Sequence, residues 1–198
     1  MSTLHVVSIL DRSGSMSGSQ AEVIGAYNAF VAEQKKIAHE KNIKSKVSLV
    51  LFDDQYQEVY SKVKVDEVPV LTEDTYYTRG MTALYDAIGK TIAKFEGKKK
   101  VIFFIETDGF ENASREYTAS ALKELVEKKK KDGWDFNFVG ADLDAATTAN
   151  MASAFGVDAS KTLAFHKSSA GYATRNMAFA DATMAYVDNN DTSAKASA

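Results

Sequence analysis

The segment LHVVSILDRSGS, residues 4–15, decides how the rest of the chain is interpreted. Its first seven residues are largely apolar, as is typical of a strand buried on both faces of a parallel sheet. Asp11, Ser13 and Ser15 follow at once, so one carboxylate and two hydroxyls lie on alternate residues where the strand ends. Ligands of open α/β sheets bind beyond the carboxyl ends of the strands. The segment therefore predicts a central strand that ends in a candidate ligand loop.

An alternation of strands and helices continues along the chain. Apolar runs predict further buried strands at residues 46–52, 101–105, 135–139 and 162–165. Residues 56–65 alternate valine with polar side chains, which is typical of an antiparallel edge strand. Amphipathic spacing predicts helices at residues 20–41, 82–97, 115–131, 145–155 and 169–187. We therefore expect an α/β fold with a doubly wound, mostly parallel six-stranded sheet, one antiparallel edge strand and helices on both faces.

Composition limits the class of protein. At 198 residues, 45% of them hydrophobic, the chain can bury a substantial core, and we expect one domain over residues 1–188 with a disordered polar tail at 189–198. A net charge of −3, with both signs mixed, gives no general attraction to nucleic acid or to an anionic membrane. The absence of cysteine excludes disulfides, thiolate metal ligands and cysteine nucleophiles. The N-terminal apolar run suits neither a signal peptide nor a membrane span, so we expect a cytoplasmic protein.

Two other loops bring oxygen side chains to the same predicted edge of the sheet. Asp108 follows the most hydrophobic run in the sequence, and Thr82 lies at or beside the start of a helix. Right-handed crossovers place both loops beside the loop that carries Asp11, Ser13 and Ser15. Two carboxylates and three hydroxyls, with no nitrogen or sulfur donor, suit Mg²⁺, with Mn²⁺ or Ca²⁺ as alternatives, better than zinc or copper. An ion held largely by neutral hydroxyls stays short of negative charge and favours an added carboxylate from a partner.

Each loop taken alone has a simpler explanation. Asp11 and Ser13 could make a turn that caps the following helix, because such side chains satisfy free backbone N–H groups. Thr82 could be only an N-cap, and Asp108 only part of a turn. It is the combination of the three loops at one edge of a sheet that favours a metal site over turn chemistry.

The residues in these loops match a known family. The pattern Asp11-x-Ser13-x-Ser15, Thr82 within Gly-x-Thr-x-Leu, and Asp108 within Thr-Asp-Gly resemble the von Willebrand factor type A domain with its metal-ion-dependent adhesion site, or MIDAS. The resemblance covers residues 4–187 and is strongest to the short stand-alone members of bacteria and their phages. It implies that the serines and the threonine bind a metal directly or by turns, and that the aspartates bind it directly or through water. An acidic residue of a partner would complete the coordination.

We therefore predict a noncatalytic, metal-dependent protein-binding module. Candidate partner contacts flank the predicted loops at Met81, Tyr77, Glu111 and Asn112. Many family members carry a second glycine where this chain has Met81. The chain departs from the family pattern there, so the path of this loop can differ from the family's. The sequence does not name the protein partner and leaves self-association open.

Two other classes of function remain as alternatives. One is a metal-dependent phosphoester hydrolase that uses Asp11 as a nucleophile or Asp108 as a base. Against it, the chain lacks an acidic residue two positions after Asp11 and has no lysine that the sequence assigns to a phosphate. More generally, no histidine, cysteine or lysine is placed by sequence to activate a serine. The other is a structural or assembly protein whose site is vestigial.

Overall fold

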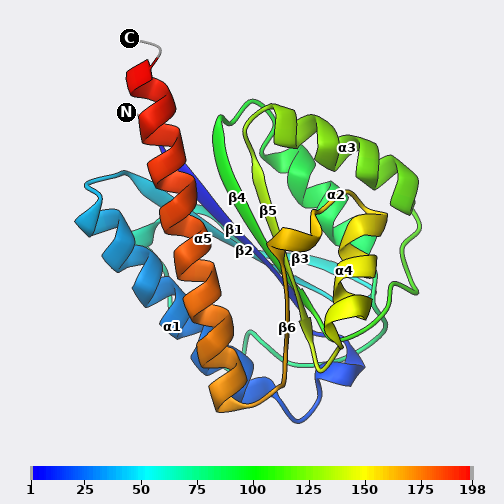
Figure 1. The fold of residues 1–198 in the computed structure, drawn as a ribbon. Helices are drawn as coiled ribbons and strands as arrows, with labels where there is room; N and C mark the ends of the chain where they lie inside the picture. Colours follow the sequence, from blue (N-terminus) through cyan, green and yellow to red (C-terminus); the bar gives the residue numbers. More distant parts are fainter. Residues whose placement is uncertain (1, 197–198) are drawn as a thin grey trace.

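The computed structural model describes residues 2–196, with residues 191–196 described by their backbone alone, as a six-stranded sheet between two layers of helices (Figure 1). The strands are β1 (Leu4–Asp11), β2 (Ser45–Phe52), β3 (Tyr56–Lys64), β4 (Lys100–Thr107), β5 (Asp135–Ala141) and β6 (Thr162–Phe165). Their order across the sheet is β3-β2-β1-β4-β5-β6. Of the described strands, only β3, at one edge, runs antiparallel to its neighbour. The predicted fold class is confirmed.

Helices cover both faces of the sheet. They are α1 (Gln20–Glu40), α2 (Leu84–Lys94), α3 (Ala119–Lys131), α4 (Ala145–Ala154) and α5 (Ser169–Ala196). In Figure 1, α1 and α5 lie side by side over one face, and α2, α3 and α4 cover the other. Of the helices that the structure describes, none combines the length and the apolar content needed to cross a membrane.

The central strand β1 explains why this arrangement forms. Every residue of β1 is buried, and alternate side chains point to opposite layers. Val6 and Leu10 join the apolar cluster beneath α1 and α5, whereas Val7 and Ile9 join the cluster beneath α2, α3 and α4. Burial on both faces requires a continuous apolar run, and this is the pattern that marked the strand in the sequence.

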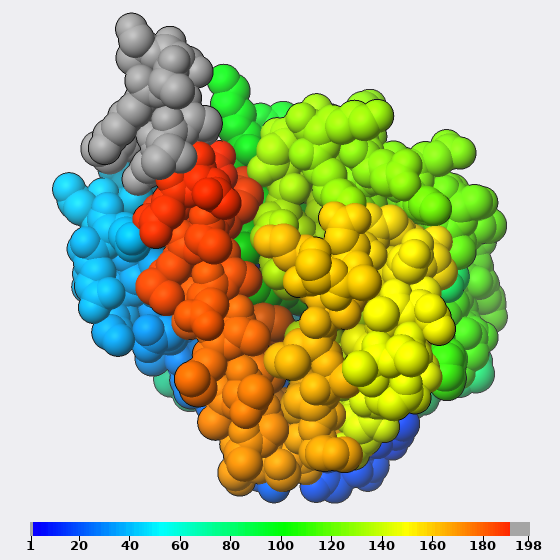
Figure 2. All heavy atoms as spheres, viewed as in Figure 1, coloured from blue at the N-terminus to red at the C-terminus, as the bar shows by residue number. Residues whose placement is uncertain are grey.

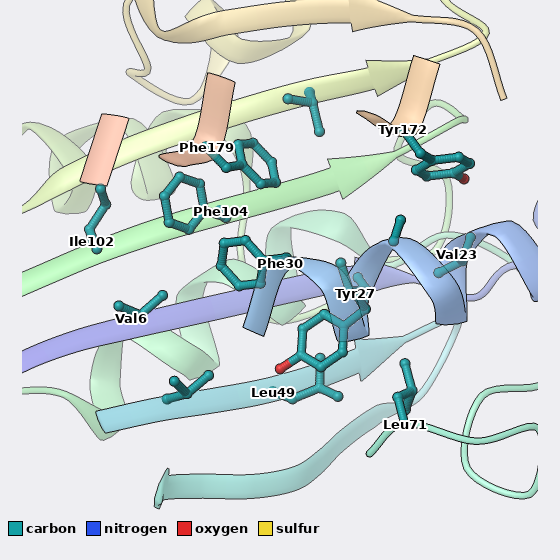
Figure 3. Packing of buried hydrophobic residues seen from close by; sticks show 14 of the residues in the cluster. Val6, Val23, Tyr27, Phe30, Leu49, Leu71, Ile102, Phe104, Tyr172 and Phe179 are labelled. Atoms are coloured by element: carbon teal, nitrogen blue, oxygen red, sulfur yellow. The ribbon is translucent and has the colours of Figure 1, made fainter. Parts of the chain in front are cut away.

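Aromatic packing fixes α1 and α5 on their face of the sheet. Figure 3 shows Phe104 of β4 among Phe30 of α1 and Phe179 of α5. The ring centroid of Phe104 lies 5.3 Å from that of Phe30 and 4.3 Å from that of Phe179. At the open edge of the sheet, the surface is hollowed between α5 and β6 (Figure 2), where residues that include Leu163 and Ala182 line a cavity of about 300 Å³.

The helix expected at residues 82–97 is shorter at both ends in the structure, and two other helix boundaries differ more from the sequence-based expectation. The helix predicted from residue 115 begins at Ala119, because both carboxylate oxygens of Asp86 accept hydrogen bonds from the backbone N–H groups of residues 115–117 and hold that segment outside the helix. The predicted disordered tail at 189–198 is helical as far as Ala196, and residues 197–198 lie outside the described residues. No glycine or proline follows Gly171, so no residue of that kind ends α5 earlier.

The carboxyl ends of the parallel strands lie together at one end of the sheet. Figure 1 shows the loop after β1 and the start of α5 at this end, at the bottom of the view. The predicted ligand loops also lie there, as their contacts show.

Candidate metal centre

The three predicted loops are joined by backbone hydrogen bonds. Gly14 N–H donates to the carbonyl of Gly80 at 3.1 Å, and Arg79 N–H donates to the carbonyl of Arg12 at 2.9 Å. The loop after β4 is joined to the same segment, since Asn112 N–H donates to the carbonyl of Thr82 at 3.0 Å. The segments that carry Ser13, Thr82 and Asp108 therefore form one continuous surface at the carboxyl end of the sheet.

A row of oxygen atoms crosses this surface. Ser13 Oγ and Ser15 Oγ share a hydrogen bond of 3.1 Å, and Ser15 Oγ donates to Asp108 Oδ1 at 2.5 Å. Thr82 faces the same space, because a methyl group added at Gly109 would lie 3.6 Å from Ser15 Oγ and 3.7 Å from Thr82 Oγ1. The glycine thus leaves a small cradle open between hydroxyls from two loops.

Asp11 lies beneath this row and is fully buried. Its Oδ1 accepts a hydrogen bond from Ser13 N–H at 2.6 Å, and its Oδ2 accepts one from Thr107 Oγ1 at 2.5 Å. Burial raises the pKa of Asp11 to about 6, and the hydrogen bonds from Thr107 and Ser13 oppose that rise. Positive charge placed close to Asp11 would favour its ionised form.

The main chain around Thr82 is held from two sides. Thr82 N–H donates to Asn112 Oδ1 at 2.8 Å, and the backbone N–H groups of Asn112 and Ala113 donate to the Thr82 carbonyl. Glu111 holds the same loop, because its carboxylate accepts hydrogen bonds from the backbone N–H groups of Ala113, Ser114 and Tyr85. Asn112 and Glu111 were expected to contact a partner. In the structure, their side chains accept hydrogen bonds from backbone N–H groups of this chain.

Met81 and Tyr77, the other two candidate contacts, are exposed. Met81 is 53% exposed, and Tyr77 is 46% exposed while its ring lies against the guanidinium groups of Arg12 and Arg79. Phe110, which no sequence pattern marks as a contact residue, directly follows the cradle glycine and is 62% exposed. Two large apolar side chains, Met81 and Phe110, therefore project from the loops beside the oxygen row.

A partly buried ion-pair network holds the threonine loop in place. Asp53 Oδ2 accepts hydrogen bonds from Arg12 Nε at 2.9 Å and from Arg79 Nε at 2.7 Å. The backbone carbonyl of Asp53 also accepts a hydrogen bond from Ala83 N–H at 2.8 Å. Asp53 thus links the loop after β1 to the loop that carries Thr82.

Lys167 is a further residue of the site that sequence reasoning missed. Its Nζ lies 2.7 Å from Asp108 Oδ2 and 3.1 Å from the carbonyl oxygen of Ser15. The only sequence signal for it is position, since Lys167 follows the last predicted strand and so lies at the same edge of the sheet.

The donor set fits a hard divalent cation. The hydroxyls of Ser15 and Thr82 line the cradle, Ser13 and Asp108 are hydrogen-bonded to Ser15, and Asp11 lies beneath them. Oxygen ligands are those that Mg²⁺, Mn²⁺ and Ca²⁺ prefer. Among the side chains that the structure describes, those of residues 2–190, no group of three or more histidine, cysteine, aspartate or glutamate residues is placed to hold a metal. A metal at this place would therefore depend on the hydroxyls of Ser13, Ser15 and Thr82 in addition to the carboxylates of Asp11 and Asp108.

Comparisons with known proteins give matches in structure alone. Neither the protein-family models nor the curated proteins contain a match to the sequence. Proximal thread matrix protein 1 (PTMP1) from the mussel byssus, in a structure with a zinc-occupied MIDAS motif, superposes with a TM-score of 0.64 at 14% identity, over 92% of this chain and 46% of that one. The vWF domain of the type V pili tip protein Mfa5 from Porphyromonas gingivalis superposes with a TM-score of 0.63 at 12% identity, over 90% and 95%.

A third similar structure is the ArnB paralog VWA2 from Sulfolobus acidocaldarius, with a TM-score of 0.55 at 19% identity over 84% of this chain. This chain spans less than half of the mussel and archaeal proteins, at 46% and 41% of their lengths, but nearly the whole of the pilus domain. At these identities the likeness concerns the fold. The chain has the von Willebrand factor type A fold.

Proposed function

We propose that this chain is a metal-dependent protein-binding module that captures an acidic side chain of a partner through a Mg²⁺-type ion. The observation that carries the proposal is the row of Ser13, Ser15 and Asp108 oxygens beside the Thr82 hydroxyl. These residues, together with Asp11, would hold the ion. When bound, the ion would act as a Lewis acid that accepts a carboxylate oxygen.

The structural neighbours support an interaction or adhesion module. They include a matrix protein of the mussel byssus and a pilus tip protein. The MIDAS motif of the mussel protein holds zinc, so a test of this chain includes Zn²⁺ beside Mg²⁺, Mn²⁺ and Ca²⁺.

The surface around the site supports a partner with an apolar residue close to its acidic one. Met81 and Phe110 are large, apolar and more than half exposed, at 53% and 62%. Isolated exposed apolar residues are common on proteins, but these two flank the oxygen row on separate loops. Their burial by a partner would add to the affinity that a single carboxylate contributes.

The buried position of Asp11 supports a noncatalytic role over the hydrolase alternative. A nucleophilic Asp11 would have to reach a phosphorus atom, yet its side chain is fully buried. Both of its oxygens already accept hydrogen bonds, from Ser13 and Thr107. The described contacts thus suit Asp11 to organising the loop rather than to attacking a substrate.

Calorimetric titration with each of the four ions tests the metal site. The wild type should bind one ion, and both Ser13→Ala and Asp11→Ala should weaken binding by at least tenfold, because each removes an oxygen donor or its support. Ser153→Ala is the matched control, since Ser153 is exposed on α4, far from the loops. Equal binding by all four proteins would contradict the proposal.

Selection from a displayed peptide library tests the partner chemistry. Peptides retained with Mg²⁺ and released by EDTA should contain aspartate or glutamate beside an apolar residue. Met81→Ser and Phe110→Ser should weaken capture of such peptides and leave metal affinity unchanged. Retention that persists in EDTA would favour a module whose metal site is vestigial.

A further inference from the structure

Lys167 places an amine inside the proposed metal centre. Its Nζ is 2.7 Å from Asp108 Oδ2, and the side chains of Lys167 and Asp108 are only 14% and 2% exposed. Solvent screens such a pair far less than a pair on the surface. The contact therefore changes the electrostatics of the site in a way that an exposed lysine would not.

The lysine is held in this position by residues outside the proposed ligand set. Asp142 Oδ1 accepts a hydrogen bond from Lys167 N–H at 2.8 Å, and Asp142 Oδ2 lies 3.7 Å from Lys167 Nζ. Asp142 is itself fixed at the end of β5, where its N–H donates to the carbonyl of Phe165 at 2.7 Å. Its backbone has a φ of 53°, in the left-handed region. The backbone and the amine of Lys167 are thus both positioned by the turn between β5 and α4.

The two oxygens of Asp108 point to different partners. Oδ1 accepts a hydrogen bond from the Ser15 hydroxyl, and Oδ2 contacts the lysine amine. Lys167 also contacts the Ser15 carbonyl at 3.1 Å, so it touches both loops that carry the oxygen row. The amine consequently contacts the carboxylate of one proposed metal ligand, Asp108, and the main chain of another, Ser15.

The charge balance of the site follows from this contact. Asp11 and Asp108 carry two negative charges when ionised, which a divalent ion would neutralise. With the charge of Lys167 added, the loaded site has a net charge of +1 in place of zero, which the half-exposed carboxylate of Asp142, 3.7 Å from the amine, offsets only in part because solvent screens it. A like charge beside the ion weakens binding of the ion, and the same surplus strengthens binding of an anion from outside.

We propose that Lys167 is a built-in cation that lowers the affinity of the site for divalent metal and raises the affinity of the loaded site for a partner's carboxylate. This role rests on the proposed function and assigns to one residue the preference for an acidic partner. Lys167 acts through Asp108 and through the net charge, and is not itself a metal ligand.

Three variants separate the charge of Lys167 from its size and from the general loss of an ion pair. Lys167→Met removes the charge and keeps the length of the side chain, and Lys167→Arg keeps the charge. Lys161→Met is the matched control, because Lys161 pairs with Asp135 at 2.9 Å near the amino ends of β5 and β6, away from the site. Far-ultraviolet circular dichroism of each variant establishes that it is folded, and Lys167→Gln replaces Lys167→Met if the latter fails.

The first measurement is calorimetric titration of each folded protein with Mn²⁺ alone. The second is titration of the Mg²⁺-loaded proteins with acetate, in which changes of the backbone amide chemical shifts in ¹⁵N–¹H spectra report binding. We expect Lys167→Met to bind Mn²⁺ about tenfold more tightly and acetate about tenfold more weakly than the wild type, because the substitution removes one unit charge that repels the ion and attracts the anion. Lys167→Arg and Lys161→Met should follow the wild type.

Two different failures can be told apart. If the wild type binds Mn²⁺ but Lys167→Met has unchanged affinity for Mn²⁺ and for acetate, the role of Lys167 is contradicted and the metal site stands. If the wild type binds none of the divalent ions, the proposed function is contradicted, and the role of Lys167 falls with it.

Discussion

Thr107 Oγ1 donates a hydrogen bond of 2.5 Å to Asp11 Oδ2, and neither side chain is exposed to solvent. Asp11 ends β1 and Thr107 ends β4, its neighbour in the sheet. The hydrogen bond therefore joins two predicted ligand loops at their bases. It also fixes the orientation of the one carboxylate that supports Ser13 N–H through its other oxygen.

Replacing Thr107 tests whether this orientation matters for metal binding. Thr107→Val keeps the shape of the side chain but removes the donor to Asp11, so affinity for Mn²⁺ should fall by roughly 10- to 100-fold, as is common for groups that orient metal ligands. Thr107→Ser keeps the hydroxyl and should stay close to the wild type. Calorimetric titration with Mn²⁺ measures both, and equal affinity of the valine and serine variants would contradict the orienting role.

The buried pair of Arg12 and Asp53 predicts a large loss of stability. Arg12 is 1% exposed and Asp53 is fully buried, so Asp53→Asn leaves a buried guanidinium without its counter-charge. Breaking such a pair costs about 3 kcal/mol or more in the free energy of unfolding. Urea denaturation measures the change.

Asp66→Asn is the matched control for that prediction. Asp66 pairs with Lys35 and His39, but its side chain is half exposed. Pairs of that kind contribute little to stability, so this variant should unfold at the same urea concentration as the wild type. A similar effect of the two substitutions would show that burial of the Asp53 pair does not set its contribution.

The backbone conformation of Gly80 is expected to affect the affinity of the site for metal. Its φ is +67°, and a Cβ there would lie 2.0 Å from Asp54 Oδ1. Gly80→Ala should therefore displace the exposed Asp54 side chain and, because Gly80 has a positive φ and its carbonyl binds Gly14 N–H, also shift the loop that carries Thr82 and weaken binding of Mn²⁺. Gly97→Ala is the control, since Gly97 also has a positive φ of +78° but meets nothing within 4 Å.

Both glycine variants should lose about 1 kcal/mol or more of stability, because L-residues disfavour positive φ. Only Gly80→Ala should change the calorimetric affinity for Mn²⁺. Loss of metal affinity in Gly97→Ala as well would point to general destabilisation in place of a local effect on the threonine loop.

His5 predicts how stability depends on pH. His5 is buried in β1, and burial together with the positive charges of Lys98, Lys62 and Lys46 lowers its pKa from 6.5 to about 4. The folded protein therefore keeps His5 neutral while the unfolded chain takes up a proton below pH 6.5. The stability that neutral His5 contributes is fully present above pH 6.5 and is lost as the pH falls toward 4.

The loss over this window should be on the order of 2 kcal/mol. Urea denaturation at several pH values in EDTA, for the wild type and His5→Leu, isolates this contribution because the other titrating groups are common to both. The variant should show the shallower decline toward pH 4. Parallel pH profiles of the two proteins would contradict the assignment to His5.

The architecture could be predicted from the sequence because the burial of a strand determines which residue types it can contain. A strand covered on both faces, such as β1, has to be apolar along its length, whereas β3, which is partly exposed along its whole length, can mix valine with polar residues. The order of these patterns then restricts the topology to a doubly wound sheet. The positions of Asp11 and Asp108 at strand ends follow from the same reasoning.

The parts that could not be predicted depend on side chains that meet from distant parts of the chain. Lys167 lies 59 residues from Asp108, and Arg12 lies 41 residues from Asp53, so no local pattern connects either pair. The start of α3 was misplaced for a similar reason, because Asp86 of α2 binds the backbone just before that helix. The helical spacing of apolar residues carries no information about such a contact.

Anomalous diffraction from crystals of the wild-type protein grown with Mn²⁺ tests the central claim most directly. The account predicts one strong anomalous peak at the cradle beside Gly109, within direct coordination distance of the Ser13 and Ser15 hydroxyls and close to Thr82, with Lys167 still near Asp108. The absence of a peak there at saturating Mn²⁺, or a single peak at another place on the chain, would contradict it.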